Sequence, residues 1–164
     1  MNSSGADSGR RQALRVIGYS AAAAGMGCIP NTAWEEESFS LTPDVAGNLI
    51  LDLSDFPELA AIGDWMNIDV STISIPNGSC DSGRAPIVVV RTSATEFKAY
   101  LNRCGHLGSK LRVDSVSEFR CPCHGSRFSV GTGTIISGPS FTDLISYPTS
   151  YDSVGNILTI SGLS

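Results

Sequence analysis

From residue 48 onward, short apolar or alternating runs are separated by turn-forming residues, a pattern typical of β-strands. Residues 86–90 read Pro-Ile-Val-Val-Val without a polar interruption, which predicts a central strand covered on both faces. Residues 57–64 are expected to form a short helical turn. Many short strands in this span predict an all-β fold, either an antiparallel sandwich or a small barrel. The predicted strands are Leu49–Leu53, Trp65–Val70, Pro86–Arg91, Phe97–Leu101, Glu118–Arg120, Thr134–Ile136, Ile145–Tyr147 and Ile157–Ile160.

The N-terminal part of the chain lacks this pattern. Residues 31–47 are polar with little periodicity and are expected to form a linker before a domain at residues 48–164. Ahead of the linker, the pair Arg10-Arg11 precedes an apolar stretch that begins at Val16. This order resembles a Tat export signal, which directs folded proteins across a membrane. A chance arginine pair in a disordered tail is the alternative.

The expected location follows from this signal. We expect residues 1–30 to be a Tat-type signal or an N-terminal anchor, with the domain on the periplasmic side of a bacterial inner membrane. The apolar part is about a dozen residues, short against the ~20 that a helix needs to cross a bilayer. Residues 25–28 resemble a lipoprotein cleavage box, so lipidation at Cys28 is a further alternative, as is cleavage after Ala21–Ala24.

Composition and charge narrow the class of partner. The formal net charge is −5, and residues 28–164 alone hold 8 basic and 15 acidic groups, a net charge of −7. An acidic balance argues against nucleic acid as a partner. It fits either docking to a basic protein or simple solubility.

Two short clusters of cysteine and histidine carry the chemistry. They are Cys104-Gly105-His106 and Cys121-Pro122-Cys123-His124, and they contain the only two histidines of the chain. Two thiolates and two imidazoles suit a tetrahedral zinc ion, or a [2Fe–2S] cluster in which two histidines replace two cysteines on one iron. Each cluster follows a predicted strand, so we expect two loops to converge on one metal site.

Three segments together resemble a Rieske [2Fe–2S] domain of the kind found in cytochrome bc-type complexes and arsenite oxidase small subunits. They are residues 104–108, residues 121–128 and residues 138–144. The resemblance covers roughly residues 48–164. It implies a Rieske-like antiparallel β-sandwich or small barrel, with a cluster-binding subdomain of two loops and one [2Fe–2S] cluster per chain.

The resemblance also implies a role for individual residues. Cys104 and Cys121 would bind one iron, and His106 and His124 the other. Ser126 would donate a hydrogen bond to a bridging sulfur. Leu107 and Pro139 would cover the cluster, Pro139 as part of a proline loop at residues 138–141.

The sequence departs from this family at two positions. Phe128 stands where a tyrosine often donates a hydrogen bond to a ligand sulfur. Fewer donors lower the potential, so we expect an intermediate value within the Rieske range of about −150 to +300 mV. Ser109 stands where bc-type proteins have a cysteine bonded to the counterpart of Cys123. We therefore expect Cys123 and Cys80 to be unpaired, a Cys80–Cys123 disulfide being the alternative.

The expected function is one-electron transfer. The chain would be an exported subunit of a membrane or periplasmic redox complex, quinol–cytochrome c reductase-like or arsenite oxidase-like, and not an enzyme alone. Its partner would be a cytochrome or a catalytic subunit, and quinol in a bc-type complex. The alternatives are a stand-alone Rieske ferredoxin-like module and a structural zinc domain. A Rieske oxygenase needs a further iron held by two more histidines, and none remains.

Overall fold

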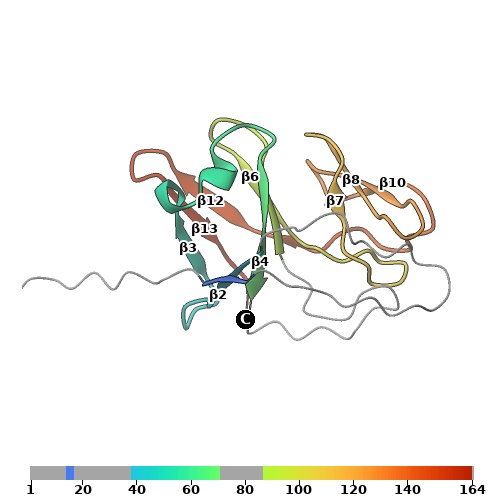
Figure 1. The fold of residues 1–164 in the computed structure, drawn as a ribbon, viewed down its shortest axis with the longest axis horizontal. Helices are drawn as coiled ribbons and strands as arrows, with labels where there is room; N and C mark the ends of the chain where they lie inside the picture. Colours follow the sequence, from blue (N-terminus) through green and yellow to red (C-terminus); the bar gives the residue numbers. More distant parts are fainter. Residues whose placement is uncertain (1–13, 17–37, 71–86, 164) are drawn as a thin grey trace, which may run out of the picture.

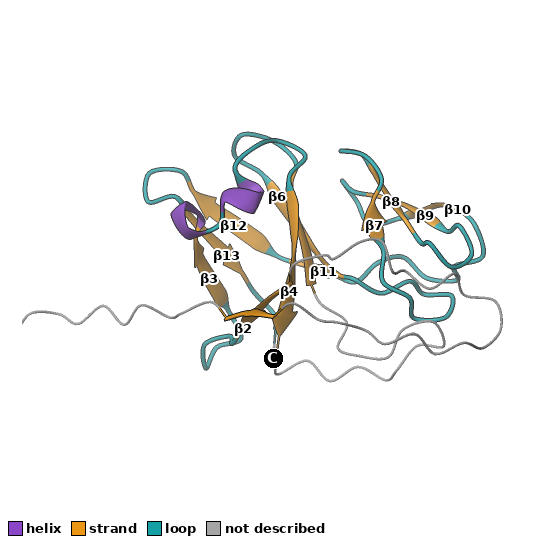
Figure 2. Ribbon diagram, in the orientation of Figure 1, coloured by secondary structure: helices purple, strands orange, loops and turns teal. Residues whose placement is uncertain are grey.

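The computed structural model describes residues 14–16, 38–70 and 87–163. These residues form short strands and two 3₁₀ helices, which confirms the expected all-β class (Figure 2). The elements are β1 (Leu14–Val16), β2 (Ser38–Leu41), β3 (Leu49–Asp52), η1 (Leu53–Asp55), η2 (Pro57–Leu59), β4 (Trp65–Val70), β5 (Ile87–Arg91), β6 (Phe97–Leu101), β7 (Arg112–Val113), β8 (Glu118–Arg120), β9 (Arg127–Ser129), β10 (Ile135–Ser137), β11 (Ser146–Tyr147), β12 (Thr149–Asp152) and β13 (Ile157–Ile160).

The strands form three sheets. The central sheet has the order β1-β2-β4-β5-β6-β11, and it lies between a three-stranded sheet, β12-β13-β3, and a four-stranded sheet, β10-β9-β8-β7. Figure 1 shows the two smaller sheets at opposite ends of the molecule. The four-stranded sheet, yellow to orange in that view, contains the strands on either side of the second Cys/His cluster.

Strand β5 divides the interior into two cores, as its uninterrupted apolar sequence predicts. Ile87 and Val89 face the first core, together with residues of the three-stranded sheet such as Leu51. Val88 and Val90 face the second core. All four residues from 87 to 90 are at most 1% exposed. Because side chains alternate along a strand, only an apolar residue at every position satisfies both cores.

The second core positions the metal centre. It joins the other face of the central sheet to the four-stranded sheet through Phe119 and Phe128, both 0% exposed. Cys104 and Cys121 belong to this same core. Phe128 is therefore a core aromatic residue beside the two cysteines.

The structure differs from the sequence expectation in the predicted linker. Strand β2 lies within residues 31–47 and pairs in parallel with β4, whereas every other strand pair is antiparallel among the residues described. Phe39, in β2, is 3% exposed and packs in the first core. A four-residue strand with one buried side chain is too short for a clear alternating pattern. The short strands β7, β9 and β12 were also absent from the prediction.

The N-terminal expectations fall mostly outside the described residues. Of the predicted signal segment, only Leu14–Val16 is described, and it pairs with β2. Arg10, Arg11 and Cys28 lie outside the described residues, as does Cys80. In the described ranges, no helix has the length and apolar character needed to span a membrane.

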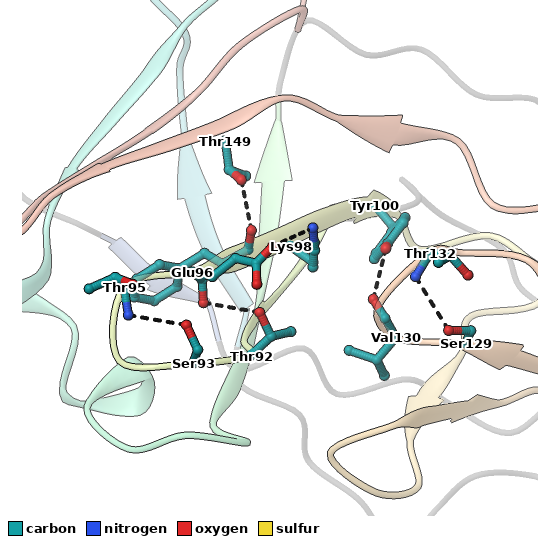
Figure 3. Close-up of polar contacts among 11 residues, drawn as sticks. Thr92, Ser93, Thr95, Glu96, Lys98, Tyr100, Ser129, Val130, Thr132 and Thr149 are labelled. Carbon is teal, nitrogen blue, oxygen red and sulfur yellow. Dashed lines mark hydrogen bonds and ion pairs between the residues drawn. The ribbon is translucent and has the colours of Figure 1, made fainter.

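A buried hydrogen bond connects the central sheet to the end of the four-stranded sheet. The hydroxyl of Tyr100, in β6, donates to the carbonyl oxygen of Val130 at 2.7 Å (Figure 3). Both residues are buried in the second core. The bond therefore holds the segment after β9 against the strand that leads into the first Cys/His cluster.

Replacing Tyr100 with Phe leaves the Val130 carbonyl without this donor. We expect the free energy of unfolding at pH 7 to fall by about 1–3 kcal/mol, measured by urea denaturation with Tyr147→Phe as a comparison. Burial, and then the charge of Glu96, raise the pKa of Tyr100 from 10.0 to about 12. The contribution of the protonated Tyr100 hydroxyl to the free energy of unfolding is complete below pH 10. It is lost as the pH rises to about 12. The difference between wild type and Tyr100→Phe should therefore narrow over that interval. A difference that stays constant with pH would contradict this account.

Candidate metal centre

The two Cys/His clusters lie in loops with the same backbone hydrogen bonds. In the first loop, the N–H of Cys104 donates to the carbonyl of Ser109, and the N–H of Gly108 donates to the carbonyl of Cys104. In the second loop, Cys121, Gly125 and Ser126 repeat this pattern position by position. Both glycines have a positive φ, 78° and 75°, a conformation that strongly favours glycine. The Cys-x-x-x-Gly-Ser spacing of each loop therefore builds the same turn twice.

Buried polar groups fix the base of the first loop. Asn102 is 0% exposed; its side-chain oxygen accepts a hydrogen bond from the N–H of Leu111 at 2.7 Å. Its side-chain nitrogen donates to the side-chain oxygen of Asn67, in β4, at 2.9 Å. Asn102 thus closes the loop across its two ends and ties it to the central sheet. The second loop needs no such clamp because β8 and β9 pair directly on either side of it.

The two loops bring the thiols of Cys104 and Cys121 together in the second core. These cysteines are 1% and 2% exposed. Hydrogen bonding with Cys104 lowers the pKa of Cys121 to about 5, and the same interaction raises the pKa of Cys104. The backbone N–H groups of His124 and Cys123 also donate toward Cys121, and that of His106 toward Cys104. The metal-free pair of thiols therefore holds one negative charge more readily than two.

The two histidines form the other half of the site. The Nδ1 atoms of His106 and His124 lie 3.2 Å apart, and the rings meet edge to face with centroids 4.7 Å apart. His106 is half-buried and His124 is exposed. Two nitrogens bound to the same metal ion at about 2.1 Å lie roughly 3–3.4 Å apart at ordinary bond angles. The imidazole pair therefore has the spacing of two ligands on a single metal ion.

The arrangement favours two metal ions over one. The two cysteine side chains lie together and the two histidine side chains lie together, so the four side chains form two pairs. Within the described ranges, no group of three or more His, Cys, Asp or Glu side chains is close enough to hold one ion. A single tetrahedral zinc needs four ligands around one point. A [2Fe–2S] cluster with two cysteines on one iron and two histidines on the other needs two separate pairs, and these residues fit that cofactor.

A third segment, residues 138–142, packs against both loops. The N–H of Ser140 donates to the hydroxyl oxygen of Ser126 at 3.1 Å. A Cβ atom on Gly138 would lie 2.5 Å from the Cα of Ser126, and one on Gly105 would collide with the Oγ1 of Thr142. Such close approaches leave no room for larger residues at the two glycines. The segment that contains Pro139 is thus held against each of the two loops, and its covering of the cluster stays a prediction.

Exposed apolar side chains lie next to the histidine pair. Leu107 is 43% exposed and Phe141 is 79% exposed. The ring of Phe141 lies 5.8 Å from that of His106 between centroids. Pro139 is half-buried. The surface beside the histidines therefore includes apolar side chains that are open to solvent.

The position of the missing disulfide is occupied by a polar contact. The Sγ of Cys123 donates to the Oγ of Ser109 at 3.3 Å. Among the described cysteines, Cys104, Cys121 and Cys123 are all free. Cys123 thus faces the residue that stands in place of its usual partner. The alternative, a Cys80–Cys123 disulfide, involves Cys80, which lies outside the described ranges.

All of the candidate site residues named from the sequence lie in these three segments. Sequence reasoning missed Asn102, Ser140 and Phe141 as individual contributors. Phe141 and Ser140 belong to a segment that the resemblance did mark, but their contacts depend on how that segment folds over the loops. Asn102 offered only a weak signal, a polar residue at the end of an apolar strand.

Comparison with known proteins agrees with this geometry. Residues 68–148 match the family model described as the Rieske [2Fe-2S] domain. No curated protein sequence matches the chain. These residues therefore form a Rieske [2Fe–2S] domain, and the cofactor of such a domain is a [2Fe–2S] cluster that carries one electron.

Solved structures resemble the chain more distantly. The cyanobacterial plasma membrane Rieske protein PetC3 from Synechocystis PCC 6803 is 26% identical, with a TM-score of 0.41 over 50% of this chain and 82% of its own. The ferredoxin of carbazole 1,9a-dioxygenase from Nocardioides aromaticivorans IC177 is 20% identical, with a TM-score of 0.47 over 70% of this chain and 97% of its own. A complex of reduced oxygenase and oxidized ferredoxin in carbazole 1,9a-dioxygenase includes a chain that is 22% identical, with a TM-score of 0.43 over 62% of this chain and 91% of its own.

Gly138→Ala tests how the third segment protects the site. The added methyl group meets backbone atoms of Ser126 at 2.5 and 2.9 Å, and φ at Gly138 is +97°. We expect residues 138–142 to move off the loops and the purified protein to lose iron several-fold faster during incubation with a chelator. The matched control is Gly131→Ala, where the nearest atom to the new Cβ is 3.8 Å away. Equal rates of iron loss in the two variants would contradict the proposed packing.

Proposed function

We propose that the chain is an exported one-electron carrier that serves as a subunit of a membrane or periplasmic redox complex. In this proposal, the thiolates of Cys104 and Cys121 hold one iron of the [2Fe–2S] cluster, and His106 and His124 hold the other. Ser126 donates to the cluster sulfur from the second loop. The protein supplies binding, orientation and electrostatics, and its partner supplies the electron or receives it.

One observation carries this proposal: the cysteine pair is buried, whereas the histidine pair reaches the surface. The thiols are at most 2% exposed, and His124 is exposed beside the half-buried His106. An electron carrier needs one end of its cofactor shielded from water and the other close to a partner. The two Nδ1 atoms face each other, so the Nε2 atoms are the groups that would approach that partner.

The surface around the histidines suits a transient protein partner. Exposed apolar residues such as Leu107 and Phe141 are the residue type that interface centres favour. Residues 102–145 hold five basic and three acidic groups, so the acidic character of the whole chain comes from other segments. The slight excess of basic groups near the site weakens the expectation of a strongly basic partner. It supports docking through shape and apolar contact instead.

The N-terminal sequence supports export in a folded state. A cluster bound by reduced cysteines is assembled most readily where thiols stay reduced, in the cytoplasm. The twin arginine before an apolar segment provides a route for the folded product. The proposed location is therefore the periplasmic side of a bacterial inner membrane, with the N-terminal segment as the signal or the anchor.

Matched cysteine variants test the ligand assignment. Cys121→Ser should remove the cluster, seen as loss of the electron paramagnetic resonance signal of dithionite-reduced protein and of two irons per chain by elemental analysis. Cys123→Ser, two residues away, should retain both, because its thiol contacts Ser109 and not the cluster. Stoichiometric zinc with no paramagnetic signal in the wild-type protein would overturn the assignment.

Arginine variants test the export route. Replacing Arg10 and Arg11 with Lys should confine the folded, cluster-containing protein to the cytoplasm, measured by cell fractionation and immunoblotting. Arg15→Lys, at the edge of the same segment, is the control and should leave export unchanged. Export of the double variant at the wild-type level would exclude the Tat route.

A further inference from the structure

Three arginines lie side by side on the outer face of the four-stranded sheet. Arg112 pairs with Arg120 across β7 and β8, and Arg120 pairs with Arg127 across β8 and β9. Phe119 and Phe128, the strand neighbours of the last two arginines, face the second core and are 0% exposed. Because side chains alternate along a strand and cross-strand partners share a face, all three arginines point away from that core. We call Arg112, Arg120 and Arg127 the arginine row.

Carboxylates neutralise the arginine row only in part. Like charges directly opposite each other on neighbouring strands destabilise a sheet, so such a row needs compensation. Arg127 forms ion pairs with Asp114 at 3.1 Å and with Glu118 at 3.0 Å. Arg120 is exposed and forms no ion pair with another of the residues that the structure describes. Arg120 therefore carries a positive charge that is open to a partner.

The arginine row lies at the base of the second Cys/His loop. Arg120 directly precedes Cys121, and Arg127 directly follows Ser126, so the pairing of β8 with β9 closes the loop at these two arginines. They are four and three residues away from the exposed His124. A molecule that approaches the histidine pair therefore meets the charge of the row close by.

The charge of the chain is divided unevenly between this part of the molecule and the rest. Residues 102–145, which contain both loops and the four-stranded sheet, hold five basic and three acidic groups, a net charge of +2. The other residues of 28–164 hold three basic and twelve acidic groups, a net charge of −9. A molecule with this charge distribution turns its positive end toward an acidic surface as it approaches.

We propose that the arginine row, through Arg120, is a docking surface for a partner protein whose own surface carries carboxylates, and that this contact brings the histidine pair to the redox centre of the partner. Guanidinium groups match the planar geometry of carboxylates and bind them through two parallel hydrogen bonds. The exposed side chains of Leu107 and Phe141 supply apolar contact beside the histidines once the partner is oriented. An anionic membrane is a poorer occupant, because it repels the acidic remainder of the chain.

This inference rests on the proposed function, electron transfer at the histidine end. Its test uses the full, cluster-containing chain and two electron acceptors that share one fold and one haem. They are cytochrome c, which is basic, and succinylated cytochrome c, whose modified lysines carry carboxylates. In each reaction the reduced cluster gives one electron to the ferric haem, which becomes ferrous. Stopped-flow absorbance at low ionic strength then gives a second-order rate constant for each acceptor.

Arg120→Gln should lower the ratio of the rate constant with the acidic acceptor to that with the basic acceptor by roughly two- to fivefold. Arg120→Glu should lower it further. The matched control is Lys98→Gln, which changes the net charge equally but lies in β6 of the central sheet, where Lys98 is ion-paired with Glu96 at 2.7 Å (Figure 3). This control should change the ratio much less. In the wild type, added salt should slow the reaction with the acidic acceptor, because salt screens attraction.

Several outcomes would contradict the docking surface. A reaction with the acidic acceptor that becomes faster as salt is added would show repulsion at the site. Equal changes of the ratio in Arg120→Gln and Lys98→Gln would assign the effect to net charge and not to the arginine row. Self-association in sedimentation velocity at low salt, lost in Arg120→Gln, would make the occupant a second copy of the chain. Binding to phosphatidylglycerol vesicles, lost in the same variant, would make it a lipid surface.

Failure of the proposed function has a different signature. A wild-type protein without the paramagnetic resonance signal of the reduced cluster would overturn that function, and the docking surface with it. A protein that holds the cluster but shows no dependence of the ratio on Arg120 would overturn the docking surface alone. Iron content and the resonance signal of each variant are therefore compared with those of the wild type before the rates are measured.

Discussion

The side-by-side burial of the Cys104 and Cys121 thiols is the contact on which the rest of the metal centre depends. Two sulfurs that carry negative charge are costly to bury unless donors compensate them. The matched turns provide these donors, because each directs backbone N–H groups toward its own cysteine. The same turns carry the histidines outward to the surface. The same turn, present in both loops, thus separates a shielded end of the site from an exposed end.

The rest of the fold supports this separation. Strand β5 faces two cores at once, and its second face packs with both cysteines in one apolar cluster. Asn102 and Tyr100 connect this second core to the central sheet through buried hydrogen bonds. Residues 138–142 then close over the loops at points where only glycine fits. Sheet, loops and cover form a single packed unit, so the geometry of the site is inseparable from that of the second core.

The sequence predicted the parts of this arrangement that have local signals. The apolar run at residues 86–90 predicted the doubly covered strand, and the Cys/His spacing predicted two converging loops. It did not predict β2, whose pairing depends on a distant strand. It marked Ser109 as the site of a missing disulfide, but not its position beside the Cys123 thiol. That position depends on how the two loops meet, which no local pattern encodes.

Loss of the usual disulfide changes the kind of connection between the loops. A covalent bond is replaced by a contact of 3.3 Å between Cys123 and Ser109. A disulfide restricts the unfolded chain and typically contributes about 2–4 kcal/mol, whereas a hydrogen bond contributes about 1 kcal/mol. The loops are then held mainly by the apolar core, by the covering segment and by the cofactor itself. Cofactor binding and local folding should be closely coupled in this protein.

The central claim is that two histidines bind one end of a two-iron cluster. Because the chain contains only two histidines, labelling histidine with ¹⁵N labels only the proposed ligands. Electron–nuclear double resonance of the reduced, labelled protein should show strong coupling of the electron spin to two nitrogen nuclei. Coupling to one nitrogen, or to none, would contradict the account.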